Sequence, residues 1–439
     1  MKNVLVLGAG LVARPLVRYL LDQPDLEVTV ASRTVSKAEA LIGGRPRGRA
    51  LAFDIVKDGD TLGALVAQSD LAISLLPYIY HVQVAEQCVR HRRHMVTTSY
   101  VKEAMQALDG AAREAGVILL NEIGVDPGID HMSAMRIIDR VHRAGGQIAH
   151  FRSYCGGLPA PEANTNPFGY KFSWSPRGVL LAGRNDARYL ENGQIVEVPN
   201  SRLFATRHTV PINGVGDLVA YPNRDSLPYR DLYGIPETRT IYRGTLRYPG
   251  WCETWQAFVE LGLLDLTGRD DLAGLTWRQL IARLIGKPEA KDVRGELATH
   301  LGLSRNSAVL DRFEWLGLLS DEPLPAAPTI LDALAVPMEA RLSYEPGERD
   351  MLVLLHDFIA EYPGRTEHIT STMVDFGIPH GDTSMARTVS LPAAIATRLI
   401  LEGRINLTGV HIPVRPEIYE PVLDELEQMG IRVEEHVEV

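Results

Sequence analysis

The chain has 439 residues, of which 45% are hydrophobic and 23% are charged, so it can bury a large core and is too long for one ordinary domain. Its 45 basic and 55 acidic residues give a formal net charge of -10, which argues against nucleic acid or an anionic membrane surface as a partner. No apolar run approaches the ~20 residues that cross a bilayer, and no signal-peptide pattern opens the chain. We therefore expect a soluble, cytoplasmic protein of two or three domains.

The first third of the chain alternates short β-branched runs with helical segments, as a doubly wound parallel sheet requires when both its faces are covered. The expected strands are Asn3–Leu7, Glu27–Ala31, Leu71–Leu76, Met95–Thr98 and Val117–Asn121. The expected crossover helices are Leu11–Asp22, Val35–Leu41, Ile79–Arg92 and Val101–Ala115. This pattern predicts an α/β fold that begins with a Rossmann-type domain.

After the first third of the chain, the pattern of regular strand and helix alternation ends. Strand-like pieces near 151–155, 194–198 and 238–243 indicate a mixed sheet, and residues 251–335 have helical periodicity. Two more strands are expected at 351–358 and 368–374, then helices near 384–402 and 416–429 and a final strand at 431–437. We expect the ending to rejoin the first sheet.

A glycine-rich turn joins the first expected strand to the first helix. In Gly8-Ala9-Gly10-Leu11-Val12-Ala13, Gly8 permits the tight turn, Gly10 lets backbone amides reach a pyrophosphate, and Ala13 lets helix and strand pack closely. The helix N-terminus stabilises phosphate charge. We predict dinucleotide contacts at Gly8, Gly10, Leu11, Val12 and Ala13, although such glycines also occur in turns that bind no nucleotide.

The second strand ends in Ser32-Arg33-Thr34, where an NAD site would usually present Asp or Glu to the ribose 2′-hydroxyl. An arginine flanked by hydroxyls suits a 2′-phosphate, so we predict NADP as the cofactor; a solvated surface charge is the alternative for Arg33. By topology, Asp54 and Ile55 are expected on the adenine side of the cofactor, and Leu75 near the nicotinamide ribose.

The segment 121–131, Asn-Glu-Ile-Gly-Val-Asp-Pro-Gly-Ile-Asp-His, resembles the NADP-dependent, L-glutamate-forming saccharopine dehydrogenases. Longer blocks at 153–162, 166–175, 221–226, 243–248, 348–351 and 384–386 extend the resemblance over almost the whole chain. Few residues of 255–335 match the family, and the sequence differs from the family pattern at Pro176 and in 209–218.

This resemblance implies that L-glutamate and L-2-aminoadipate 6-semialdehyde condense to an imine, which NADPH reduces to saccharopine, and that the reverse oxidation also occurs. It implies a homodimer and three domains. These are a Rossmann domain from 1–125 with 390–439, a mixed α/β substrate and dimerisation domain from 126–250 with 336–389, and an α-helical domain from 251–335.

Saccharopine has three carboxylates, so its site needs cations with planar, bidentate geometry. Arg224 and Arg247 lie in the family blocks and suit this role, with Thr245 and Leu246 beside them. Ser99 and Tyr100 follow the strand expected at Met95–Thr98, at the edge where open α/β sheets bind ligands. The resemblance places Ser175 near cofactor and substrate. A structural ion pair or a packed ring is the alternative for each arginine and tyrosine.

Imine formation and reduction need a proton donor and acceptor. Asp126, in a Pro-Gly turn beyond a strand end, is the leading candidate, and its alternative role is to bond the amides of that turn. Tyr100 and Cys155 are further candidates, although a lone cysteine is more often a buried apolar residue. His131 and the pair His91 and His94 lack the ligand spacing of a metal site, so we expect no metal.

Two other functions remain open at this point. One is a carboxynorspermidine- or homospermidine-type imine reductase, whose site needs anionic contacts and fewer arginines. The other is a non-catalytic NADP-sensing regulator, which would tolerate the loss of Asp126, Arg224 and Arg247. Turnover of the dinucleotide separates the regulator from both enzymes.

Overall fold

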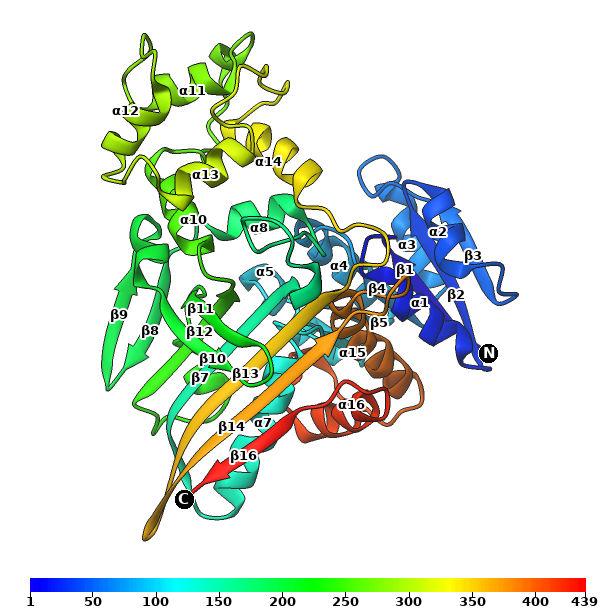
Figure 1. Cartoon of the computed structure of the whole chain (residues 1–439). Helices are drawn as coiled ribbons and strands as arrows, with labels where there is room; N and C mark the ends of the chain where they lie inside the picture. Colours follow the sequence, from blue (N-terminus) through cyan, green and yellow to red (C-terminus); the bar gives the residue numbers. More distant parts are fainter. The chain divides into compact units, whose positions relative to one another are not determined.

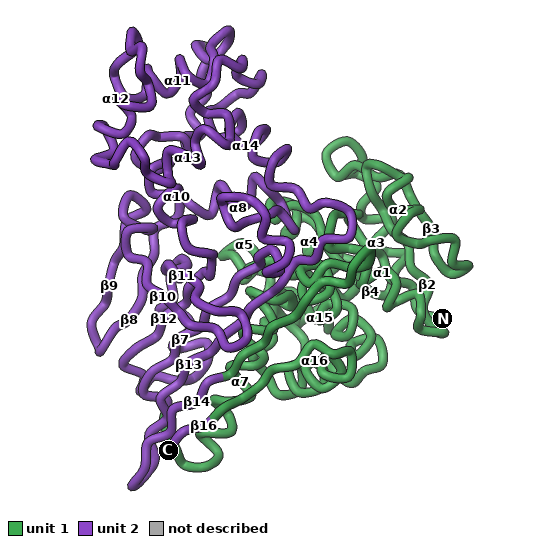
Figure 2. Tube along the Cα trace, in the orientation of Figure 1, with its two compact units in different colours: residues 1–147, 371–436 green, residues 148–370, 437–439 purple. Residues whose placement is uncertain are grey.

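The computed structural model describes the backbone of residues 1–439 and every side chain except that of Asp270. The chain forms two compact units, coloured separately in Figure 2. Unit 1 contains residues 1–147 and 371–436, and unit 2 contains residues 148–370 and 437–439. The three-domain division expected from the sequence stays a prediction.

Unit 1 is built on a seven-stranded parallel sheet with the order β15-β6-β5-β4-β1-β2-β3 (Figure 1). Its strands are β1 Lys2–Leu7, β2 Leu26–Ser32, β3 Gly48–Ala52, β4 Leu71–Ser74, β5 His94–Thr97, β6 Ile118–Leu120 and β15 Gly409–His411. The strand order reverses between β1 and β4, so the loops that follow these two strands flank the switch point where such sheets bind ligands. The Rossmann-type fold predicted from the sequence is confirmed.

Helices cover both faces of this sheet. Successive residues of β1 point to opposite faces, yet Val4, Leu5, Val6 and Leu7 are all buried. The helices of unit 1 are α1 Ala13–Asp22, α2 Val35–Ile42, α3 Leu62–Ala67, α4 His81–His91, α5 Glu103–Gln106, α6 Asp109–Ala115, α7 Ile129–Arg143, α15 Ser384–Leu401 and α16 Pro416–Gln428. Helix α15 packs against α1 and α16, so C-terminal residues complete the N-terminal core.

Four features of unit 1 differ from expectation. Strand β3 and helix α3 were not among the expected elements, because Gly48–Ala52 has no β-branched residue and Leu62–Ala67 is only six residues long. The helix expected over Val101–Ala115 is two shorter helices, α5 and α6. The expectation for the final strand was wrong: the short β15 joins the first sheet, whereas β16, Glu434–Glu438, belongs to the second.

The second sheet is mixed and has the order β10-β11-β12-β7-β13-β14-β16, with β8 paired to β12 and β9 paired to β8. Strand β12 runs parallel to β7 and antiparallel to β11. The other strands are β7 Gln147–Pro159, β8 Ala187–Glu191, β9 Gln194–Val198, β10 His208–Ile212, β11 Gly216–Pro222, β12 Thr240–Arg247, β13 Asp350–Tyr362 and β14 Arg365–Phe376. The mixed second sheet predicted from the sequence is confirmed.

Helices of unit 2 include the expected helical stretch, and Figure 1 shows α10 to α14 gathered beyond one end of the sheet of this unit. The helices are α8 Pro176–Ala182, α9 Pro228–Leu232, α10 Trp251–Glu260, α11 Trp277–Leu284, α12 Val293–His300, α13 Ala308–Trp315 and α14 Ile330–Arg341. Side-chain oxygens of Thr276, Asp292, Ser307 and Thr329 cap α11 to α14, which explains why a stretch weak in family resemblance still folds as helices. Across the described residues, no helix has both the length and the apolar character of a membrane span.

Candidate functional site

The turn after β1 has the geometry of a dinucleotide-binding loop. Gly8 has φ +114°, and a Cβ added there would lie 2.9 Å from the carbonyl oxygen of Leu75, so only glycine fits. A Cβ added at Gly10 would meet no atom within 4 Å, which leaves open space over the loop for a ligand. Ala13 is fully buried where α1 meets the sheet.

Helix α1 begins without a protein cap. No side chain caps its N-terminus, and its first turn has no acidic residue. The helix dipole and the lack of a side-chain cap therefore favour an anion from outside the protein. Leu11 is 70% exposed beside them. This arrangement fits the pyrophosphate predicted from Gly8, Gly10, Leu11, Val12 and Ala13.

Arg33 follows the last residue of β2 and is exposed. Among the described residues it forms no ion pair and no hydrogen bond through its side chain, so its guanidinium is available to a ligand. Its neighbours Ser32 and Thr34 carry hydroxyls, and the Ser32 hydroxyl oxygen accepts the Thr34 amide at 3.3 Å. These three residues fit a 2′-phosphate.

The remaining cofactor candidates follow β3 and β4. Asp54 is half-buried, and its carboxylate accepts the Val56 amide at 3.0 Å in a local turn, so part of its hydrogen-bonding capacity is already used. Ile55 is buried. The Leu75 amide donates to the carbonyl oxygen of Leu7 at 2.9 Å, which places Leu75 beside the glycine loop.

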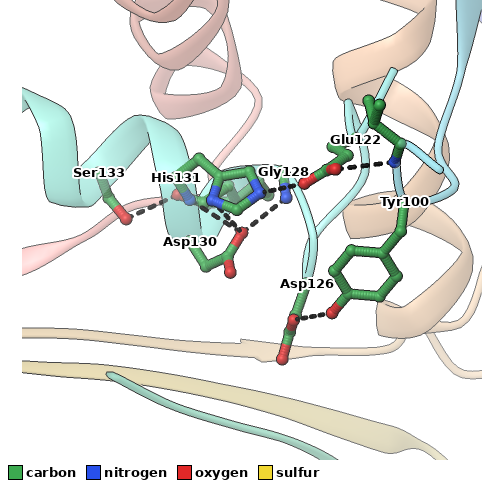
Figure 3. Close-up of polar contacts among 9 residues, drawn as sticks. Tyr100, Glu122, Asp126, Gly128, Asp130, His131 and Ser133 are labelled. Carbon is green, nitrogen blue, oxygen red and sulfur yellow. Dashed lines mark hydrogen bonds and ion pairs between the residues drawn. The ribbon is translucent and has the colours of Figure 1, made fainter. Parts of the chain in front are cut away.

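The loop after β6 carries Asp126, and Figure 3 shows its side chain pointing toward Tyr100. The Tyr100 hydroxyl donates to Asp126 Oδ1 at 3.1 Å, which joins two candidates that lie 26 residues apart. The amide of Gly128 donates instead to Asp130 Oδ1 at 2.6 Å. Asp130 therefore bonds that turn amide, a role that the sequence left open for Asp126.

Gly128 holds this loop closed. It has φ +147°, and a Cβ added there would lie 2.1 Å from the carbonyl oxygen of Gly124. Backbone amides of Gly124 and Ile129 donate to the carbonyl oxygens of Pro127 and Gly124, both at 2.9 Å. The backbone on either side of Asp126 is thus fixed by local bonds.

A buried pair behind the loop links its start to helix α7. His131 Nε2 lies 2.8 Å from Glu122 Oε2, and both side chains are almost fully buried (Figure 3). Glu122 Oε1 accepts the Val101 amide at 2.8 Å, which ties the same carboxylate to the segment after Tyr100. Glu122 thus connects the two segments that carry Tyr100 and Asp126.

Replacing His131 with leucine should lower the free energy of unfolding by about 3–5 kcal/mol, because it leaves the buried Glu122 carboxylate without this partner. Urea unfolding measured by circular dichroism checks this value. The double variant H131L/E122Q removes the carboxylate charge as well and should be destabilised less than H131L. Equal destabilisation of the two variants would contradict a charge-based role for the pair.

His81 forms a second buried cluster at the carboxyl ends of β4 and β5. Its Nδ1 lies 2.8 Å from the Ser74 hydroxyl, and its Nε2 lies 2.8 Å from the Ser99 hydroxyl and 3.3 Å from that of Thr97. Burial lowers the pKa of His81 to about 4. Ser99, a predicted substrate contact, is therefore held by a neutral histidine that the sequence did not single out.

In unit 2, Arg247 at the end of β12 is a buried cation. Its side chain is 5% exposed, and its guanidinium carbon lies 5.0 Å from the ring centre of Tyr170 and 5.3 Å from that of Trp251. Its Nη1 donates a hydrogen bond to the carbonyl oxygen of Leu246 at 2.7 Å. It has no carboxylate partner among the described residues, and its Nε and the Nε1 of Trp251 are buried without hydrogen bonds there.

A buried charge without a counter-ion is costly, so the surroundings of Arg247 favour an anion. Planar guanidinium donors suit a carboxylate, and the two aromatic rings favour the cation through their π faces. Tyr170 and Trp251 are functional candidates that the sequence did not reveal. The available signal was the position of Trp251, four residues after Arg247.

The other predicted residues of unit 2 lie near Arg247 or apart from it. Thr245 is half-buried and pairs in register with the buried Cys155 of β7, and Leu246 is fully buried. Arg224 is exposed in a turn after β11, beyond Pro222, which pairs with Gly244. Gly244 is three residues, or roughly 10 Å, from Arg247 along β12. The backbones of Arg224 and Arg247 therefore lie at different places on the sheet.

Ser175 lies at the N-cap of α8, where its hydroxyl oxygen accepts the Gly178 amide at 3.2 Å. This local bond accounts for a serine at that position, and its predicted role toward the cofactor stays a prediction. Among the residues whose side chains are described, no group of three or more His, Cys, Asp or Glu could hold a metal ion.

Family models match most of the chain. Residues 4–120 match the saccharopine dehydrogenase NADP binding domain, and residues 124–431 match the saccharopine dehydrogenase C-terminal domain. The first match contains the glycine loop and Arg33, and the second contains Asp126 and Arg247.

Relatives extend the similarity to full length. A saccharopine dehydrogenase (NADP(+), L-glutamate-forming) of Schizosaccharomyces pombe is 44% identical over 100% of this chain and 99% of its own. The solved apo saccharopine dehydrogenase (L-Glu forming) of Saccharomyces cerevisiae has a TM-score of 0.91 at 42% identity, with 100% of both chains covered. A homospermidine synthase of Legionella pneumophila has a TM-score of 0.59 at 10% identity over 99% of this chain and 91% of its own, which shows a shared fold alone.

Proposed function

The chain belongs to the saccharopine dehydrogenase family, and from this membership we propose that residues 1–147 hold NADP and the main proton-transfer group, and that Ser99, Arg224 and Arg247 bind substrate carboxylates. The activity is the NADP-dependent condensation of L-glutamate with L-2-aminoadipate 6-semialdehyde to saccharopine, a step of lysine metabolism, together with its reverse. The structural observation that supports this function most strongly is the buried Arg247 without a carboxylate partner.

NADPH, when bound, supplies the hydride that reduces the imine. The chain offers it the uncapped first turn of α1, the open space over Gly10 and the exposed Arg33. Arg33, Ser32 and Thr34 bind the 2′-phosphate, because a guanidinium and two hydroxyls supply hydrogen-bond donors and a positive charge that match this dianion. The ribose of NAD has no phosphate at this position and would leave the charge of Arg33 without a partner. Asp54 and Leu75 border the two ends of the cofactor.

Asp126 moves protons, and the Tyr100 hydroxyl is its hydrogen-bond donor. The glutamate amine adds to the aldehyde, the carbinolamine loses water with the help of an acid, and the imine then takes up a hydride and a proton to give the secondary amine. The Tyr100 hydroxyl, bonded to Asp126 Oδ1, orients this carboxylate. Asp126 serves as the group that gives and takes the proton, and Cys155 is a second candidate whose burial makes it less suitable.

Three side chains are proposed for the substrate carboxylates. Arg247 binds one through its buried guanidinium, and Arg224 binds another from its separate position beyond β11. Ser99 donates a hydrogen bond from the carboxyl edge of the parallel sheet. The half-buried Thr245 and the neighbouring Leu246 shape the surroundings of Arg247.

This arrangement separates the function from its rivals. A diamine-derived imine has no carboxylate for a buried arginine, so Arg247 would remain uncompensated in a homospermidine-type reductase. A regulator that only senses NADP needs neither Arg247 nor the pairing of Tyr100 with Asp126.

The direct test mixes the purified protein with saccharopine and NADP at mildly alkaline pH and follows absorbance at 340 nm. Reduced cofactor should appear with NADP and more slowly with NAD. A parallel reaction with homospermidine should give no signal. Turnover of homospermidine but not of saccharopine would replace this function with the polyamine reaction, and no turnover of either would favour the sensor.

The cofactor preference should depend on Arg33. The variant R33A is expected to raise the KM for NADP by about ten- to hundred-fold, because a charge-assisted contact to the 2′-phosphate is lost. The KM for NAD should stay unchanged. The matched control is R18A, which removes an exposed arginine of α1 and should leave both KM values unchanged. An equal change for both cofactors in R33A would contradict a 2′-phosphate contact.

We further propose that the protein is a cytoplasmic homodimer. The resemblance to the family supports the dimer, and three buried cysteines without a disulfide among them suit a reducing compartment. Light scattering coupled to gel filtration measures the oligomeric state, and a mass of one chain, 48.4 kDa, would overturn the dimer.

A further inference from the structure

The most informative feature outside the proposed chemistry is the cluster around His81. This histidine is 4% exposed and begins helix α4. Its ring reaches the last residues of two neighbouring strands, Ser74 of β4 and Thr97 of β5, and also Ser99 just beyond β5. Three hydroxyls therefore converge on one buried imidazole.

The ring is neutral near pH 7, because burial lowers the pKa of His81 to about 4. A neutral imidazole donates from one nitrogen and accepts at the other. The partners on the two sides must therefore match one of two tautomers, with the hydrogen on Nδ1 or on Nε2.

Thr97 decides between the two tautomers. Its hydroxyl donates its single hydrogen to the backbone carbonyl oxygen of Ser74 at 2.9 Å. Toward His81 Nε2, at 3.3 Å, the Thr97 oxygen then presents lone pairs. A bare Nε2 would face them with its own lone pair, which is unfavourable, so the hydrogen lies on Nε2 and Nδ1 accepts from the Ser74 hydroxyl.

The Nε2 hydrogen also points to the hydroxyl oxygen of Ser99 at 2.8 Å. Ser99 accepts this bond, so its own hydroxyl hydrogen is not used by His81. Among the described residues, the Ser99 hydroxyl has no other partner, and Ser99 is partly exposed. Its hydrogen is therefore available to an acceptor outside the protein.

We propose that His81 is a positioning residue that is held as its Nε2–H tautomer by Ser74 and Thr97 and thereby keeps the Ser99 hydroxyl as a donor to a substrate carboxylate. The inference rests on the proposed function in one respect, the placement of that carboxylate at the carboxyl edge of the parallel sheet. A purely structural tie between the ends of β4 and β5 would not require Ser99 to bond a ligand.

The tautomer is measured without any substrate. In full-length protein labelled with ¹⁵N-histidine, long-range ¹H–¹⁵N correlation distinguishes Nε2–H, Nδ1–H and imidazolium forms, and H81Q identifies the signal by its loss. The expected result is the Nε2–H form, retained in S99A. The near-isosteric T97V removes the deciding hydroxyl and should give a mixture of tautomers. An Nδ1–H form or an imidazolium in the wild type overturns the proposal.

Steady-state kinetics test the link to substrate. S99A should raise the KM for saccharopine by about ten-fold or more, because a hydrogen bond to a carboxylate is lost. H81L should also raise the KM for saccharopine, with a smaller change in kcat. H81Q, which restores an N–H donor, should have a KM between those of H81L and the wild type. The double variant H81L/S99A should have the same KM for saccharopine as S99A alone, because both substitutions act through the Ser99 hydroxyl.

The matched control is H91L at the other end of α4, which should leave the KM unchanged. If H81L fails to fold, T97V takes its place and should raise the KM less than S99A. An active wild type whose KM does not change in S99A overturns the proposal while the function stands. A wild type that does not oxidise saccharopine overturns the function itself, so the two failures are distinguishable.

Discussion

The variant R247M is expected to raise the KM for saccharopine by about a hundred-fold or more without lowering the free energy of unfolding. The substrate carboxylate would lie beside Tyr170 and Trp251 without a cation, and an unpaired buried charge costs about 3–5 kcal/mol. In the free protein the same change removes a buried charge that has no acidic partner among the described residues. Methionine fills a similar volume, so the fold should keep its stability.

Steady-state kinetics and urea unfolding of the same preparations measure both quantities. R247K keeps the charge but loses the planar fork, so its KM should lie between those of the wild type and R247M. The control R188M removes an exposed arginine of unit 2 that pairs with Asp225 at 3.4 Å, and it should leave the KM unchanged. A stable R247M with an unchanged KM would show that Arg247 does not bind substrate.

The variant D126N should lower kcat for saccharopine oxidation by about 10²–10⁴-fold, the range over which a positioned acid or base contributes. Asparagine has nearly the same shape and still accepts a hydrogen bond from Tyr100, so the loop closed by Gly128 should stay intact. NADP affinity, measured by quenching of intrinsic fluorescence, should not change. Stopped-flow and steady-state rates at 340 nm give the chemical step.

Y100F should reduce kcat less than D126N, because it removes the bond that orients the carboxylate rather than the carboxylate itself. The control D22N changes a carboxylate of α1 that pairs with Arg45 and should leave kcat unchanged. If D126N keeps its full kcat, another group moves the proton, and Cys155 is the remaining candidate.

The cofactor contacts were predicted from local patterns, and they stay predictions. The glycines at 8 and 10 act through the conformation and space of a single turn, and Arg33 acts from the end of one strand. Each requirement is visible within a few residues of sequence. The same reasoning placed Ser99, Tyr100 and Asp126 at strand ends, because parallel strands bring their carboxyl ends to one edge.

Features that depend on distant segments could not be predicted in this way. Tyr170 and Trp251 surround Arg247 only after three segments of unit 2 have packed together. A lone histidine at the start of a helix is usually a surface residue. The sequence therefore gave no indication that His81 bonds to residues at the ends of two strands. The final strand was assigned to the wrong sheet because pairing partners are chosen by tertiary packing rather than by β-propensity.

The unpaired guanidinium of Arg247 also has a thermodynamic consequence. A carboxylate ligand would supply the counter-ion that Arg247 lacks among the described residues, so binding should raise the melting temperature through linkage to the native state. Small dicarboxylates such as glutarate should then protect the protein in proportion to their affinity, even though no reaction follows. If Arg247 binds a substrate carboxylate as proposed, the substrate would neutralise a buried charge of the native protein before it takes part in any chemistry.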